Sequence, residues 1–111
     1  MEIKQFDIWL ANLNQSKGTE PGKTRPVVIV QTDLLNDFHP STLICPIISK
    51  VQREVKYLRV HLSSTQIDKL SDILVDQIRA IDNQRLIKRL GKLTKSQQLK
   101  LKENLAIVLD L

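Results

Sequence analysis

Residues 18–30 have the sequence GTEPGKTRPVVIV, in which a polar loop runs directly into an apolar, β-branched segment. The loop half contains two glycines, a proline and the cation Lys23, a composition typical of turns. The apolar half continues as PVVIVQ (26–31), which is too short for a helix and predicts a buried strand beginning at Pro26. Arg25 stands at the junction of loop and strand, where a side chain is well placed to meet a ligand.

Other segments on both sides of this stretch have the composition or the alternation of strands. They cover residues 6–13, 42–49, 57–62, 71–81 and 88–93. Polar connections cover 14–25 and 32–42, and the second of these should contain a helical turn from Asp33. In the first strand Phe6, Ile8 and Leu10 should share one face. The strand at 42–49 should be interrupted or bulged at Pro46, because proline has no N–H to donate.

The C-terminal segment has the pattern of a helix. Thr94 is followed three residues later by Gln97, which forms a capping box. The apolar residues that follow recur at helical spacing, and they are Leu101, Leu105, Val108 and Leu109. Five or six short strands and one terminal helix predict a mainly β fold, a small barrel or rolled sheet. Neither a linker nor a repeat divides the chain, so residues 1–111 should form a single domain.

The composition narrows the class of protein. The chain has 111 residues and a net charge of +5, which favours an anionic partner such as nucleic acid. Its single cysteine, Cys45, lies in an apolar run and should be a buried structural thiol in a reducing cytosol. No segment approaches the ~20 apolar residues of a membrane helix, and the N-terminus does not resemble a signal peptide. We therefore expect a soluble, cytoplasmic protein.

Metal and cofactor motifs are missing from the sequence. His39 and His61 are not spaced as metal ligands, and neither a P-loop nor a GxSxG motif occurs. A ribonuclease mechanism with one histidine as base and one as acid is conceivable, but nothing in the sequence places the two together. We expect no metal and no cofactor.

The cations fall into three clusters, each beside a predicted strand end. They are Lys17, Lys23 and Arg25; Lys50, Arg53, Lys56 and Arg59; and Arg85, Lys88, Arg89 and Lys92. Each could be an ordinary solvated face, or the three could converge on a groove that follows phosphates. Asp76, which follows an apolar run, has a structural interpretation as a sheet-end carboxylate bonded to backbone N–H groups, to Arg25 or to Arg79. In the functional interpretation Asp76 and Gln77 contact base edges or orient Arg25.

Three stretches together resemble the MazF/PemK toxin family. They are FDIWLANLNQSKGTEPGKTRPVVIVQTDLLN (6–36), LICPIIS (43–49) and ILVDQIRAIDNQRLIKRLGKLT (73–94), within a similarity that spans about 6–109. The resemblance implies an SH3-like barrel of the CcdB/PemK type with added helices and a homodimer. It implies a metal-independent endoribonuclease that cleaves single-stranded RNA at short sequences through attack of the 2′-OH, and an antitoxin whose C-terminal tail covers the RNA site. CcdB relatives with the same fold poison DNA gyrase instead of cleaving RNA. This function is a remote alternative here, because those relatives lack the GK.RPVV pattern that this chain contains.

The resemblance also assigns residues. Arg25 matches the family's catalytic arginine. The family usually ends the next strand with threonine, often followed by serine, whereas here Ile48 occupies that position and Ser49 follows. Either Ser49 supplies the hydroxyl or the hydroxyl is lost, which leaves a weakened homologue that binds RNA or antitoxin. Phe6 replaces a common glycine, a change expected to alter packing only. The catalytic candidates are Arg25 and Ser49, and the candidate RNA-binding residues are Lys17, Glu20, Lys23, Thr24, Lys50, Arg53, Asp76 and Gln77.

Overall fold

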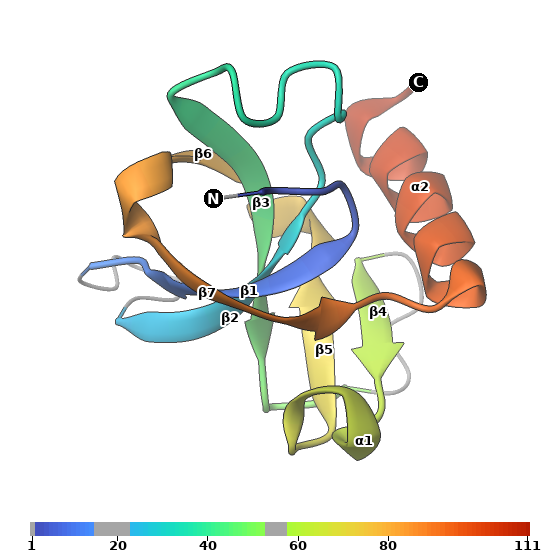
Figure 1. Ribbon diagram of the computed structural model, residues 1–111. Coiled ribbons are helices and arrows are strands. Elements are labelled where there is room, and N and C mark those ends of the chain that lie inside the picture. The colour runs from blue at the N-terminus through green and yellow to red at the C-terminus, as the bar shows by residue number, and fades with distance from the viewer. Residues whose placement is uncertain (1, 15–22, 53–57) are drawn as a thin grey trace.

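The computed structural model describes residues 2–14, 23–52 and 58–111 (Figure 1). Seven strands form one antiparallel sheet in the order β4-β5-β3-β2-β1-β7, and β6 also pairs with β3. The strands are β1 (Asp7–Asn12), β2 (Thr24–Ile29), β3 (Ser41–Ile48), β4 (Arg59–Leu62), β5 (Ser71–Leu74), β6 (Arg79–Asp82) and β7 (Leu86–Lys92). The helices are α1 (Ser64–Ile67) and α2 (Lys95–Leu109), with 3₁₀ turns η1 (Val75–Gln77) and η2 (Asn83–Arg85).

The mainly β fold with a C-terminal helix is confirmed, but the sheet does not close into a barrel. Within the described residues, β4 pairs with β5 alone and β7 pairs with β1 alone. Glutamine side chains connect the two edges instead of a strand ladder. Gln97 Nε2 donates to the carbonyl oxygen of His61 at 3.2 Å, and Gln66 Nε2 donates to that of Lys92 at 3.4 Å. The two glutamines also bond each other, so α1 and the start of α2 fill the gap between β4 and β7.

The interruption expected in β3 lies in its partner instead. β3 runs unbroken through Pro46, whereas the segment predicted as one strand over 71–81 is divided into β5, η1 and β6. β5 pairs with Ile47 and Ile48, and β6 pairs with residues 41–44, both along the same edge of β3. Proline has no N–H to give to a ladder. The partner chain leaves this edge as η1 beside Cys45 and Pro46, and no ladder bond from Pro46 is needed there.

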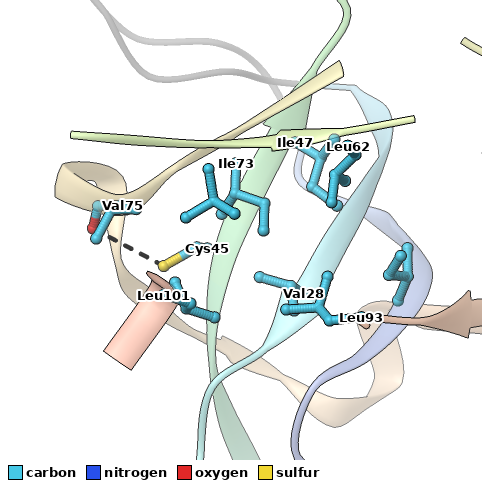
Figure 2. Packing of buried hydrophobic residues seen from close by; sticks show 10 residues of the cluster. Val28, Cys45, Ile47, Leu62, Ile73, Val75, Leu93 and Leu101 are labelled. Carbon is cyan, nitrogen blue, oxygen red and sulfur yellow. Dashed lines mark hydrogen bonds between the residues drawn. The ribbon is translucent and has the colours of Figure 1, made fainter. Parts of the chain in front are cut away.

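Both faces of the central strands are covered. One core cluster lies between the sheet and α2 and contains Ile8, Val28, Cys45, Ile47, Val60, Leu62, Ile73, Val75, Leu93 and Leu101 (Figure 2). The other contains Ile3, Trp9, Ala11, Leu13, Val27, Ile29, Ile44, Ile81 and Leu86. Successive residues of β2 therefore enter different clusters, which explains its continuous apolar sequence. For the same reason β1 has no polar face: Trp9 and Ala11 are buried as well as Ile8, and Leu10 is only half-buried.

Helix α2 begins as the sequence predicts. Thr94 Oγ1 accepts a hydrogen bond from the Gln97 backbone, and Gln97 Oε1 accepts one from the Thr94 backbone, so the capping box is confirmed. Leu101 is buried, and Leu105 and Val108 pack at the edge of the core. Leu109 is exposed, because it lies about 100° around the helix from Val108, which still packs against the core. Among the described residues, no helix has both the length and the apolar character required to cross a membrane.

Phe6 adopts a backbone conformation that side chains rarely occupy. Its φ is 71°, in the left-handed region that favours glycine. Its N–H donates to the carbonyl of Ile29 at 2.7 Å, and its carbonyl accepts from the N–H of Leu93 at 3.0 Å. The replacement of glycine by phenylalanine therefore affects the backbone as well as the packing, and the expectation that it alters packing only is wrong.

Candidate active site

A cavity of about 280 Å³ opens where the start of β2 meets the end of β3. We call it the arginine cavity. Its lining residues are Thr24, Arg25, Pro26, Ile47, Ile48, Ser49, Ile67, Asp68, Lys69 and Ser71. It therefore brings together both catalytic candidates, Arg25 and Ser49, and one of the candidate RNA-binding residues, Thr24.

The register of β2 and β3 explains how these residues meet. The two strands pair from Ile29–Ile44 to Val27–Pro46. Continuing the same antiparallel register sets Arg25 opposite Ile48, so these two side chains lie on one face of the sheet. β3 ends at Ile48, and Ser49 borders the cavity from the first position beyond the strand. Arg25 is half-buried and belongs to β2, which begins two residues earlier than predicted, at Thr24.

The segment between α1 and β5 supplies two further charges that sequence reasoning missed. Asp68 and Lys69 border the arginine cavity beside Arg25. Asp68 caps α1 with a φ of 71°, which turns the chain toward β5. The available signal was the exposed Asp-Lys pair next to Ile67, but α1 itself was not predicted. Two cations against one carboxylate leave this part of the cavity net positive, which suits an anionic ligand.

A second cavity, of about 300 Å³, adjoins the first. Its lining residues are Ile48, Gln52, Leu58, Arg59, Leu74, Asp76 and Gln77, and we call it the DQ cavity. Ile48 borders both cavities and separates them. Asp76 and Gln77 lie on η1, the turn that interrupts the partner of β3. Asp76 is exposed, so its carboxylate does not need a partner to offset burial.

Asp72 is a buried carboxylate that the sequence analysis did not single out. It is fully buried on β5 and accepts hydrogen bonds from the Gln52 backbone at 2.9 Å, Arg59 Nη1 at 3.1 Å and His61 Nδ1 at 2.5 Å. Burial alone would raise the pKa of Asp72, but the hydrogen bonds from Gln52, His61 and Arg59 outweigh it and hold the pKa below its ordinary value. Asp72 is therefore charged at neutral pH. Its signal in the sequence was an acid inside a strand.

The remaining candidates lie elsewhere. Lys23 and Lys50 are exposed and border neither cavity. Lys17, Glu20, Arg53 and Lys56 lie outside the described residues. In the third basic cluster, Arg89 forms an ion pair with Asp7 at 3.1 Å. Arg85 borders a separate cavity with Asn12, Asp82, Gln84 and Ile87.

The two histidines do not meet. His39 bonds Ser41 at the start of β3, whereas the partner of His61, Asp72, lies opposite Ile48 at its end. At ~3.3 Å per residue these ends are about 20 Å apart. The interpretation in which the two histidines act as acid and base at one site is therefore wrong. Cys45 is buried as predicted, and its pKa is raised to about 12 by burial and by Asp76. In the described part of the chain, no group of three or more His, Cys, Asp or Glu side chains is placed to hold a metal ion.

Residues 4–109 match the family model described as "PemK-like, MazF-like toxin of type II toxin-antitoxin system". The chain is 32% identical to "Endoribonuclease MazF" of Staphylococcus epidermidis, over 98% of this chain and 92% of the relative. It is 33% identical to "Endoribonuclease EndoA" of Bacillus subtilis (strain 168), over 100% of this chain and 97% of the relative. The crystal structure of MazF (Form-I) from Deinococcus radiodurans has the same fold, with a TM-score of 0.85 at 18% identity, covering 100% of this chain and 99% of that one.

Proposed function

Because this chain belongs to the family of PemK-like, MazF-like toxins of type II toxin–antitoxin systems, we propose that it is an endoribonuclease that cleaves single-stranded RNA. The relatives that are named endoribonucleases support the reaction, and they match the chain along nearly its whole length. The observation that carries the assignment is the arginine cavity, which gathers Arg25, Ser49 and Lys69 from three segments of the chain. Its positive charge and polar lining suit a phosphodiester.

The proposed chemistry uses the nucleophile that RNA itself carries. The 2′-OH attacks the adjacent phosphorus and the 5′-oxygen leaves, which gives a 2′,3′-cyclic phosphate. The protein must hold these atoms in line and stabilise the charge that develops on the phosphoryl oxygens. Arg25 suits this task, because its planar guanidinium can donate two hydrogen bonds to a phosphate and stays charged. Ser49 would donate a further hydrogen bond, and Lys69 would contact a neighbouring phosphate.

Base recognition is assigned to the DQ cavity. Its lining includes the apolar side chains of Ile48, Leu58 and Leu74, against which a base can pack, and Asp76 and Gln77 add polar atoms. Carboxylate and amide groups can pair with the donor and acceptor edges of an unstacked base. Ile48 borders both cavities, so the cavities are neighbours. A base in the DQ cavity and a phosphate in the arginine cavity can therefore belong to adjacent nucleotides of one RNA strand.

Ile48 also favours a second candidate function. The position opposite Arg25 usually carries a threonine in this family, and isoleucine can neither donate nor accept a hydrogen bond. If Ser49 does not replace that hydroxyl, the chain is a weakened homologue that binds RNA or its antitoxin without efficient cleavage. The two functions share the same site and differ only in the rate of cleavage.

The proposed assembly is a homodimer. We place it in the cytoplasm, because its proposed RNA substrate is found there. The family description names a toxin–antitoxin system, so a cognate antitoxin is expected as a partner. In this proposal the C-terminal tail of the antitoxin lies across the RNA site and blocks it. Several large apolar side chains are exposed, among them Leu34, Phe38 and Leu99, and pairing about a two-fold axis would cover part of this surface. Light scattering at micromolar concentration tests the dimer: a stable species of 12.7 kDa contradicts it.

The activity is tested by incubating the purified protein with a long single-stranded RNA in EDTA and mapping the new ends. We expect cleavage at a short sequence with 2′,3′-cyclic phosphate ends. Cleavage that EDTA abolishes and magnesium restores would overturn the metal-independent mechanism. Binding of the RNA without cleavage would favour the weakened homologue.

A further inference from the structure

Charged side chains of β4 and β5 form hydrogen bonds to the backbone of the segment that follows β3. The Asp72 carboxylate accepts from the backbone N–H of Gln52 at 2.9 Å. Arg59 Nη1 donates to the carbonyl of Lys50 at 2.7 Å and to Asp72 Oδ2 at 3.1 Å. One buried acid and one arginine thus hold two backbone groups of residues 49–52.

The sheet register places this acid next to Ile48, the residue that borders both cavities. Asp72 lies opposite Ile48 on β3 and opposite His61 on β4, so the three side chains form one row across the sheet. His61 Nδ1 bonds the second carboxylate oxygen at 2.5 Å. Both oxygens of Asp72 are therefore engaged, and the side chain is fixed on both sides.

The tethered segment contributes to both cavities. Ser49 at its start borders the arginine cavity, and Gln52 at its end borders the DQ cavity. Ser49 itself is exposed and lies beyond the last residue of β3, so the ladder does not fix its position. The backbone directly after it is held by Arg59, which bonds the carbonyl of Lys50, and by Asp72, which bonds the N–H of Gln52.

We propose that Asp72 is a positioning residue that acts through residues 49–52 to hold the Ser49 hydroxyl in the arginine cavity. This inference rests on the proposed function for its effect on cleavage. Asp72 touches neither cavity, so it does not contact the substrate. Removing its charge weakens the bonds from Gln52 and Arg59 together, because charge-assisted hydrogen bonds are the stronger kind. The hydroxyl then loses its fixed position, while Arg25 on β2 keeps its own.

The test is a double-mutant cycle between Asp72→Asn and Ser49→Ala, measured as kcat and KM for one RNA. We expect Asp72→Asn to lower kcat by about tenfold when Ser49 is present and by less than about twofold when it is alanine, within the range of coupled pairs. KM should change little. Equal factors in both backgrounds, or a wild-type kcat for Asp72→Asn, would overturn the proposal.

Asp7→Asn is the matched control, because Asp7 is also a buried carboxylate that pairs with an arginine, Arg89, but on β1 and β7. It should leave kcat and its dependence on Ser49 unchanged. If Asp72→Asn does not fold, Arg59→Lys replaces it. Arg59 reaches both Lys50 and Asp72 through Nη1, and the shorter lysine side chain keeps the charge but has no nitrogen at that position. The same non-additivity with Ser49→Ala is expected, and its absence would overturn the proposal.

Hydrogen exchange gives a readout that needs no catalysis. The Gln52 amide should exchange faster in Asp72→Asn than in wild type, and Asp7→Asn should leave it unchanged. Unaltered Gln52 exchange in a folded Asp72→Asn protein would overturn the positioning role, whatever the activity. If the wild-type protein cleaves no RNA at all, the proposed function fails, and this exchange measurement still decides whether Asp72 holds the segment.

Discussion

Arg25 and Ser49 approach one cavity from different strands, Arg25 from the start of β2 and Ser49 from just beyond the end of β3. Their positions have different origins. Arg25 is fixed by the ladder between β1 and β2, in which it lies opposite Ala11. Ser49 depends on side-chain bonds to the segment that follows it. The backbone of Arg25 is therefore held by the sheet itself, whereas the backbone after Ser49 is held by side chains, and substitutions at the two positions should have different consequences.

Replacement of Arg25 tests the main catalytic assignment. Arg25→Ala should lower kcat by ~10²–10³, the cost of losing one preorganised donor to the transition state, and should leave the melting temperature within a few degrees of wild type. Arg85→Ala is the matched control, because Arg85 is also half-buried but borders a different cavity. Cleavage by Arg25→Ala at the wild-type rate would show that the reaction takes place elsewhere.

Substitutions at positions 48 and 49 distinguish the active enzyme from the weakened homologue. If Ser49 supplies the hydroxyl, Ser49→Ala should lower kcat by ~10²–10³ and Ile48→Thr should add little. If it does not, Ser49→Ala should be silent, and Ile48→Thr should raise the rate by restoring a hydroxyl opposite Arg25. Because a half-buried Ile48 packs between the cavities, the melting temperature of each variant must be measured with its rate. We expect the first outcome, and a folded Ser49→Ala protein with the parental rate would contradict it.

Much of the fold follows from local sequence signals. The apolar run of β2 and the Thr94–Gln97 capping box are confirmed because each depends on residues adjacent in the chain. The division of 71–81 into β5, η1 and β6 could not be predicted, since it depends on which part of β3 lies alongside. Asp72 and Lys69 were missed for a similar reason: their roles come from Gln52, Arg59 and Arg25, which are distant in sequence.

Lys69 should contribute one phosphate contact to RNA binding. Each phosphate neutralised on a single strand adds about 0.7 to the slope of log K against log salt. Lys69→Ala should therefore weaken the binding of a non-cleavable RNA and reduce this slope by ~0.7. Lys95→Ala, on the exposed first turn of α2, should change neither quantity. Fluorescence anisotropy over a series of salt concentrations measures both, and an unchanged slope for Lys69→Ala would remove this residue from the site.

Cys45 should be inert toward thiol reagents in the folded protein. The pKa of its thiol is raised to about 12 by burial and by the Asp76 carboxylate, so almost none of it is thiolate at pH 8. The sulfur is also enclosed by the core and lies 3.8 Å from the carbonyl of Val75 (Figure 2). Mass spectrometry after iodoacetamide treatment at pH 8 should show no label on the native protein and complete label in guanidinium. Rapid labelling of the native protein would contradict this burial.

Glycine and alanine at position 6 should reverse their usual order of stability. Both Phe6→Gly and Phe6→Ala lose the ring, which packs against the core and lies 5.6 Å from Lys102 Nζ. Only alanine bears the steric cost of a φ near 71°, ~1–2 kcal/mol, which exceeds the entropic cost of glycine, ~0.4–1 kcal/mol. Phe6→Gly should therefore unfold with a free energy about 0.5–1 kcal/mol higher than Phe6→Ala in urea titrations. At Leu43, an exposed position inside β3 with ordinary backbone angles, alanine should instead be the more stable of the two. If alanine is the more stable residue at position 6 as well as at position 43, Phe6 does not hold the left-handed conformation in solution.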